Sequence, residues 1–166
     1  MHTECLRIAD QLRRAFTGDP WHGDPLQTLL AGVTPTEAVA RPLGSAHNIH
    51  ELVLHIDIYV RIALEATTAG TPMPKLYRTG SDWQAVTEPD SASWNSATEN
   101  LFRNADQLAQ AVSVFRDTRL HDTVPGREYD FYYLFHGIVQ HTLYHGGQIA
   151  LLKSAGKVSR DAEKRI

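Results

Sequence analysis

The sequence predicts an all-α protein: a four-helix bundle with long connections. Apolar residues recur at helical spacing in four long segments, and no segment alternates apolar and polar residues as a strand does. A chain of 166 residues can bury a sizeable core as one domain. Residues 1–166 are therefore expected to form a single helical domain, of which residues 157–166 are a short charged tail.

The first half of the chain contains two of the long helices. The first is expected over residues 3–16, where the apolar residues form one face. Short helical turns are expected over residues 25–31 and after Thr34-Pro35, since proline favours the first helical position. The second long helix begins at the capping-box sequence from Asn48 to Glu51 and is expected to end at Gly70.

The second half contains the other two long helices. Residues 71–90 hold several prolines and no sustained period, which indicates a long connection that covers a site or crosses the bundle. The third helix is expected to begin at Ser91 or Ser93. The fourth is expected over residues 130–155 and is predicted to stop at Gly156, because glycine is common just after a helix end.

Composition excludes several classes of protein. Hydrophobic residues make up 42% and charged residues 21%, with a net charge of -3, as in ordinary soluble proteins. We expect no nucleic-acid partner, because no basic stripe is present. We also expect no membrane span and no signal peptide, because the required apolar runs are missing. The single cysteine, Cys5, cannot form an intrachain disulfide and fits a reducing cytoplasm.

His141 and His145 are the most informative pair of residues in the chain. They lie four positions apart in the fourth predicted helix, so both imidazoles share one face and could hold one metal ion. With nine histidines in the chain, such a spacing also arises by chance. Leu134, Ile138 and Ile149 extend an apolar stripe beside the pair, which indicates that it faces inward.

The residues around this pair exclude some chemistry. A helix-borne zinc protease would carry a glutamate directly after the first histidine, whereas Thr142 stands there. The chain also lacks the Gly-x-Ser-x-Gly turn that carries the nucleophilic serine of many hydrolases, and it has no glycine-rich phosphate loop. Cys5 is interpreted as an ordinary, partly buried thiol. Three glycines, Gly137, Gly146 and Gly147, weaken the helix and would permit close approach by another element or a ligand.

His55 is the candidate third ligand. It lies inside the apolar second helix, where an ionisable group is either a hydrogen-bonded core residue or a ligand. Three imidazoles from two helices would make a metal site with open coordination positions. His50 lies about 140° around the helix from His55, so both cannot reach one metal, and it is expected to be solvated. His136 fails the same angular test against His141, while His47 could reach a cleft.

These residues together resemble the DinB/YfiT-like superfamily of four-helix-bundle proteins. The matching stretches are Asn48–His55, His141–Lys153 and, more loosely, Phe16–Leu30. The resemblance implies a divalent metal, commonly zinc or nickel, held by His55, His141 and His145. It also implies activities such as S-transfer and isomerisation with bacillithiol, mycothiol or glutathione, although many members have no known activity. Homodimers are frequent in that superfamily.

Several neighbours of the three histidines are expected to contribute. Gln148 and Tyr59 can line the same cleft or serve as helix packing. Glu51 can orient His55 or complete the capping box, and the capping box is favoured. The tryptophans wall the cleft or, by default, fill the core; they are Trp21, Trp83 and Trp94.

Three functions remain open at this point. The first is a metal-dependent transferase that uses a low-molecular-weight thiol and a small-molecule substrate. The second is a metal-dependent hydrolase, and the third is a metal-binding or ligand-binding protein without turnover. A metal bound at three histidines would lower the pKa of a thiol or of a water, which is the step that the first two share.

Overall fold

The computed structural model describes residues 3–69 and 82–163, with side chains described as far as Ser159. Its regular structure is helical, and the described residues contain no strand, so the all-α prediction is confirmed. The elements are α1 (Thr3–Phe16), α2 (Leu26–Leu30), α3 (Pro35–Val39), α4 (Ile49–Ala69), α5 (Ser91–Ser113), the 3-10 turn η2 (Asp117–Arg119) and α6 (Phe131–Glu163).

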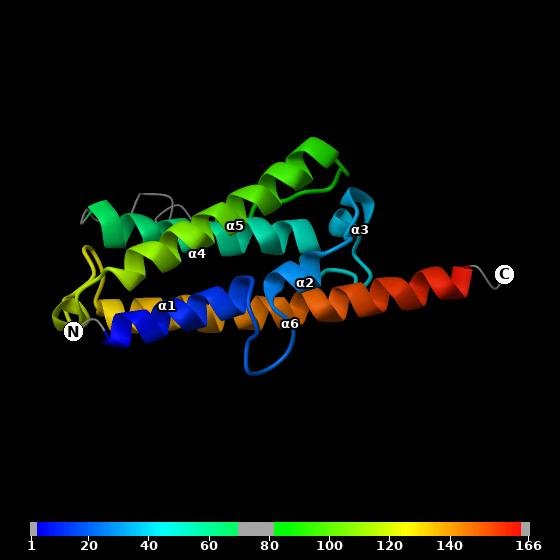
Figure 1. Ribbon diagram of the computed structural model, residues 1–166. Coiled ribbons are helices and arrows are strands. Elements are labelled where there is room, and N and C mark those ends of the chain that lie inside the picture. The colour runs from blue at the N-terminus through cyan, green and yellow to red at the C-terminus, as the bar shows by residue number, and fades with distance from the viewer. Residues whose placement is uncertain (1–2, 70–81, 164–166) are drawn as a thin grey trace.

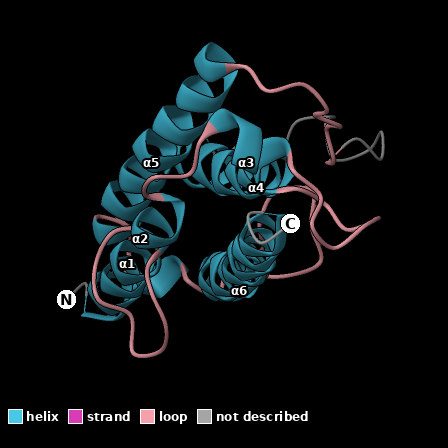
Figure 2. Ribbon diagram, turned by 90° about the vertical axis from the view of Figure 1, so that its right-hand side faces the viewer, coloured by secondary structure: helices cyan, strands magenta, loops and turns pink. Residues whose placement is uncertain are grey.

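The four long helices surround a common centre, as the two ribbon views show (Figures 1 and 2). Helix α4 packs against both α5 and α6, and α1 packs against the same two helices from the other side. The short helices pack on the outside of the long ones, α2 against α6 and α3 against α4. Because α4 and α6 are direct neighbours, side chains on their facing sides can meet.

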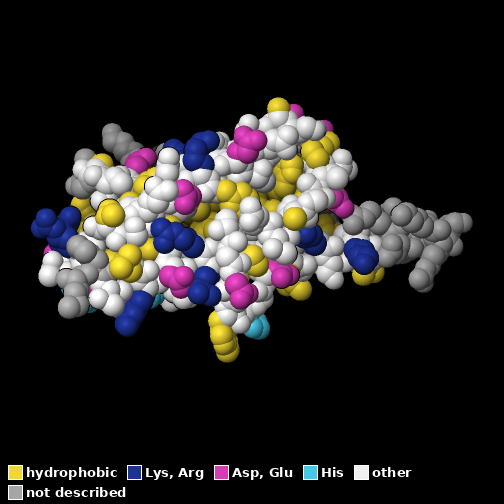
Figure 3. All heavy atoms as spheres, in the orientation of Figure 1, with side chains coloured by type: hydrophobic (Ala, Val, Ile, Leu, Met, Phe, Trp, Pro, Cys, Tyr) yellow, Lys and Arg dark blue, Asp and Glu magenta, His cyan; other side chains and the backbone are white. Residues whose placement is uncertain are grey.

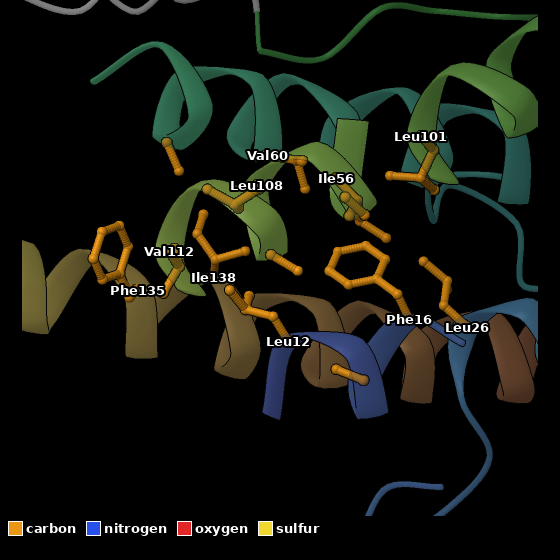
Figure 4. Close-up of a cluster of buried hydrophobic side chains, with 14 of the residues drawn as sticks. Leu12, Phe16, Leu26, Ile56, Val60, Leu101, Leu108, Val112, Phe135 and Ile138 are labelled. Atoms are coloured by element: carbon orange, nitrogen blue, oxygen red, sulfur yellow. The ribbon is translucent and has the colours of Figure 1, made fainter. Parts of the chain in front are cut away.

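The core is one continuous apolar cluster to which every long helix contributes. Figure 4 shows side chains from different helices interdigitating in it. Full burial of a leucine or phenylalanine side chain stabilises a fold by about 1.5–3 kcal/mol, so this cluster is the main source of stability. Its labelled members are Leu12, Phe16, Leu26, Ile56, Val60, Leu101, Leu108, Val112, Phe135 and Ile138.

Helix starts follow the capping signals in the sequence. At α3 the Thr34 hydroxyl accepts from the Glu37 N–H at 3.3 Å, and the Glu37 carboxylate accepts from the Thr34 N–H at 2.9 Å. Helix α5 begins at Ser91, one of the two expected positions, and its cap is Asp90. The Asp90 carboxylate satisfies backbone N–H groups that have no partner inside the helix.

The prediction that the last helix stops at Gly156 is wrong. Helix α6 continues to Glu163 and extends beyond the other helices at its C-terminal end (Figure 1). A single glycine costs a helix only about 1 kcal/mol relative to alanine, and no proline follows to block the next turn. The expected charged tail is therefore helical as far as residue 163, and residues 164–166 lie outside the described part.

The predicted connection over residues 71–90 is described only from Asp82 onward, and Gly70 also lies outside the described residues.

On the face shown in Figure 3, charged side chains of both signs are interspersed with apolar ones. Within the described residues, none of the helices has the length and apolarity needed to cross a membrane.

Helix α1 receives its N-terminal cap from a residue far away in the sequence. The Asp117 carboxylate accepts hydrogen bonds from the N–H groups of Glu4 at 3.2 Å and Cys5 at 3.0 Å. Hydrogen bonds from the backbone and side chain of Cys5 lower the pKa of Asp117 to about 2. Burial, followed by the hydrogen bond to Asp117, raises the pKa of the fully buried Cys5 thiol to about 12. Such a thiol is inert as a nucleophile, as the sequence indicated.

Replacement of Asp117 should therefore destabilise the protein in a pH-dependent way. A carboxylate whose pKa is depressed by folding contributes stability above its unfolded pKa of about 3.9, and that contribution is lost as pH falls toward 2. We expect Asp117→Asn to unfold at a lower temperature than the wild type at pH 7, with the difference shrinking below pH 4. Thermal melts across this range test it, with the exposed loop variant Asp24→Asn as control. Equal melting temperatures at pH 7 would contradict the capping role.

Candidate metal centre

The structure brings His55, His141 and His145 together between two neighbouring helices. His55 comes from α4, and the other two occupy successive turns of α6 on the side that faces it. The Nε2 atom of His141 lies 3.1 Å from Nε2 of His55 and 3.1 Å from Nε2 of His145. One ligand atom from each residue lies within 4.8 Å of the others, as a metal site requires.

Hydrogen bonds orient two of the three imidazoles. His55 Nδ1 lies 3.0 Å from the backbone carbonyl oxygen of Asp82, and His145 Nδ1 lies 2.6 Å from Oε1 of Gln148. Both oxygens can only accept, so both Nδ1 atoms carry the proton. The Nε2 atoms of His55 and His145 then present lone pairs to the centre of the cluster. In metalloproteins, such partners fix the ring and tautomer of a ligating histidine.

This arrangement fits a cation better than a set of hydrogen bonds. If His141 carries a proton on Nε2, it can donate to one of the two lone pairs that face it, and the other stays unpaired. Two nitrogen ligands at roughly 2.0–2.1 Å from a tetrahedral zinc lie about 3.3 Å apart, close to the observed separations. The donor set and its spacing therefore suit a divalent metal, with one or more coordination positions left over.

Burial keeps these imidazoles neutral, which is the form that binds metal. Burial lowers the pKa of His55 and of His145, although the hydrogen bonds to Asp82 and Gln148 oppose the shift. Burial, together with the charges of the other two histidines, lowers the pKa of His141 to about 3. Metal binding at this site consequently requires little displacement of protons at neutral pH.

A stack of three rings forms one wall of the cluster. The Trp83 indole lies parallel to the His55 imidazole, with centroids 3.8 Å apart, and parallel to the His47 imidazole at 3.6 Å. Two rings cannot occupy the same face of the indole, so Trp83 is sandwiched between the two histidines. The core was the default expectation for Trp83; the structure instead places it in the wall of the cavity beside His145. The connection that carries it has no apolar periodicity, so nothing in the sequence indicated this position.

The carboxylate of Glu51 holds the His47 end of this stack. Oε1 accepts from Arg41 Nη2 at 2.5 Å and from the Val86 N–H at 3.1 Å, while Oε2 lies 3.0 Å from His47 Nδ1. Burial alone would raise the pKa of Glu51, but these hydrogen bonds, with one from the Asn48 N–H, lower it. The capping box with Asn48 is confirmed. The alternative, that Glu51 orients His55, is wrong: the Glu51 carboxylate accepts a hydrogen bond from His47, and His55 Nδ1 faces the carbonyl oxygen of Asp82.

Two cavities flank the cluster. The larger, of about 440 Å³, borders His145 and Gln148 and is otherwise lined by Leu43, Ala46, His47, Leu52, Trp83, Tyr144, Leu151 and Leu152. The smaller, of about 230 Å³, borders His141 and Tyr59 together with residues at the start of α6. The sequence left Gln148 and Tyr59 between a shared cleft and helix packing; Gln148 lines the cavity beside His145, and Tyr59 lines the one beside His141.

Among the described residues, the other histidines and the other two tryptophans lie outside the cluster. The expectation that His50 is solvated is wrong, because its side chain is only 1% exposed. Trp94 of α5 covers it, and the centroids of the two rings lie 5.3 Å apart in an edge-on arrangement. Trp94 fills the core, as expected by default. Trp21 does neither of the things expected of it, since it is 98% exposed in a loop. His136 is likewise absent from the cluster.

One of the three helix glycines permits a close approach. A Cβ atom at Gly146 would lie 3.3 Å from Cδ1 of Leu29, so the glycine lets α2 pack tightly on α6 directly after His145. At Gly137 and Gly147 an added Cβ would meet no atom within 4 Å in the described structure, so close packing does not explain those two.

Residues 21–149 match the protein-family model of the DinB superfamily. The chain belongs to the DinB superfamily. No curated protein and no solved structure gives a significant match. The matched range contains α4 and the part of α6 that holds His141 and His145, so this DinB protein carries all three histidines within the family region. They form a cluster that could hold a metal ion.

Metal removal should lower the thermal stability of this DinB protein at neutral pH. A metal kept at a hundredfold excess over its Kd adds about 2.7 kcal/mol, roughly 5–10 °C in melting temperature for a chain of this size. Burial lowers the pKa of all three imidazoles below the usual value of about 6.5, so protons compete with the metal only in more acidic solution. The metal-linked stability is therefore present at neutral pH and lost as pH falls well below that usual value. Melts with and without chelator should therefore converge in acid.

His145→Ala is the matched variant for this measurement. It should lose most bound metal by elemental analysis, and chelator should leave its melting temperature unchanged at pH 7. Wild-type stoichiometry in this variant would argue against ligation by His145. An unchanged wild-type melting temperature after confirmed metal loss would show that the ion is not coupled to folding.

Proposed function

We propose that this DinB protein is a metal-dependent transferase that joins a low-molecular-weight thiol to an electrophilic small molecule. The observation that carries the proposal is the convergence of three imidazole Nε2 atoms beside a cavity of about 440 Å³. His55, His141 and His145 would hold the ion, and zinc or nickel suits an all-imidazole donor set. When bound, the ion would lower the pKa of a thiol or water at a remaining position.

The cavity beside His145 supports a reaction between organic molecules. Most of its lining is aliphatic or aromatic, and its polar side chains include His47, His145 and Gln148. Small-molecule sites are commonly built in this way, with apolar walls that bury the ligand and a few polar groups that orient it. The superfamily's thiol-dependent transferases favour a thiol as one reactant, and the cavity gives the electrophile a place beside the ligands.

A screen of the metal-loaded protein tests this proposal. The protein, with its zinc or nickel content measured, is mixed with 1-chloro-2,4-dinitrobenzene and with glutathione, cysteine, bacillithiol or mycothiol in turn. We expect thiol-dependent product formation that is abolished by chelator and in His145→Ala. Hydrolysis of 4-nitrophenyl acetate without thiol, and no thiol transfer, would favour the hydrolase alternative. Tight metal binding without either reaction would favour a binding protein.

We also propose that two copies of the chain associate. Exposed apolar side chains on α1 and α6 support this, because association of two copies would remove their apolar surface from water. Light scattering should give the mass of a dimer at micromolar concentration, and Leu143→Glu should shift it toward the monomer. A monomeric wild type over that range would refute the proposal. The side chains are Leu6, Tyr133, Leu143 and Val158, each at least 40% exposed.

A further inference from the structure

We propose that His47, held by Glu51, is the proton-transfer residue of the cavity next to the metal ligands. The proposal rests on the proposed function, because it assigns the group that removes the proton of the attacking thiol. His47 lies before the first turn of α4 and is not one of the three clustered histidines. Three observations carry the inference: its hydrogen bond, its stacking and its place in the cavity wall.

The hydrogen bond to Glu51 determines which nitrogen of His47 is available. Nδ1 lies 3.0 Å from Oε2 of a carboxylate that is 2% exposed. Because the carboxylate accepts, Nδ1 carries the proton, and Nε2 is the nitrogen that can take up or release one. Within the described chain Nε2 has no hydrogen-bond partner. An imidazole oriented by a buried carboxylate is the arrangement used for general base catalysis, since the carboxylate also stabilises the imidazolium that forms.

Glu51 is suited to orient His47 and to stabilise its protonated form. Arg41 and the N–H groups of Val86 and Asn48 hold its carboxylate in one position. The hydrogen bonds keep its pKa low despite burial, so it remains ionised beside His47. Its position does not depend on His47 alone, and replacement of the imidazole leaves three donors on the carboxylate.

Stacking and position direct His47 toward the same space as the metal ligands. Its ring lies on the face of Trp83 opposite His55, so the indole separates it from that ligand and prevents it from joining the cluster. Its side chain is 47% exposed, and it lines the cavity together with His145 and Gln148. A molecule in the cavity can therefore contact His47 from one side and the cluster from the other.

The step that His47 would perform is a balanced proton transfer. Nε2 takes the proton from the thiol S–H, and the electron pair of that bond stays on sulfur. Sulfur then forms a bond to the electrophilic carbon, and the leaving group departs with the electron pair of the bond that breaks. The imidazolium returns its proton to the leaving group or to solvent, which restores the neutral imidazole that is hydrogen-bonded to Glu51.

His47→Phe and His47→Gln test this role in the zinc-loaded protein. Phenylalanine keeps the stacking on Trp83 without a nitrogen, and glutamine can keep a hydrogen bond to Glu51 without relaying a proton. With glutathione and 1-chloro-2,4-dinitrobenzene, we expect kcat at pH 7 to fall roughly a hundredfold or more in both variants, with metal content, melting temperature and KM close to wild type. Raising the pH, which ionises the thiol without a base, should recover part of the rate.

A chemically similar pair provides the control. His121 Nδ1 lies 2.9 Å from Asp130 Oδ2 near the start of α6, and its side chain is 79% exposed. His121→Phe removes an imidazole–carboxylate pair of the same kind and should leave kcat unchanged. Wild-type kcat in His47→Phe, or equal losses in both phenylalanine variants, would overturn the assignment.

A second measurement needs no turnover. Long-range ¹H–¹⁵N spectra of the zinc-loaded wild type should show a proton on Nδ1 of His47 at neutral pH, with Nε2 unprotonated. A neutral His47 protonated on Nε2 alone would overturn the assignment. Absence of thiol transfer by the wild type, with Nδ1 of His47 protonated, would contradict the proposed thiol reaction and leave His47 as a base for the hydrolase alternative. The ester assay on the same variants would then decide that role.

Discussion

The buried carboxylate of Glu51 is the interaction on which the geometry of this site depends. It joins four parts of the chain: the segment after α3, the approach to α4, the first turn of α4 and the connection that follows residue 82. An isolated buried carboxylate would be costly, but each of its oxygens receives donors here. The connection held in this way supplies both Trp83 and the carbonyl of Asp82, and these two groups contact His55.

The three clustered histidines show a balance between packing and function. Three neutral imidazoles in a partly buried site offer more lone pairs than they can satisfy among themselves, because a single proton on His141 cannot serve two neighbours. A core selected for stability alone would place apolar side chains there. The fixed tautomers of His55 and His145 turn this deficit into a preorganised set of donors, which is the property that a metal site needs.

Sequence alone predicted the bundle and the His141–His145 pair because both depend on local periodicity, whereas His55 was added from its place in an apolar helix and from the family resemblance. Helical spacing reveals the inward face of a helix, and the i,i+4 rule places His141 and His145 side by side. The same reasoning failed where tertiary contacts decide. The burial of His50 depends on Trp94, and the stacking of Trp83 depends on the path of a connection without period. The continuation of α6 past Gly156 was missed because a weak local signal was read as a stop.

The sandwich of Trp83 between two imidazoles also gives the molecule an internal optical reporter. Of the three tryptophans, one is almost fully exposed, one is buried in the core, and Trp83 alone contacts the candidate ligands. Its indole senses the charge of the imidazole on each face, and charge changes the fluorescence of an indole. Trp83 emission should therefore follow events at the cluster and at His47 without an added dye. A chain with Trp21 and Trp94 replaced by phenylalanine would isolate that signal.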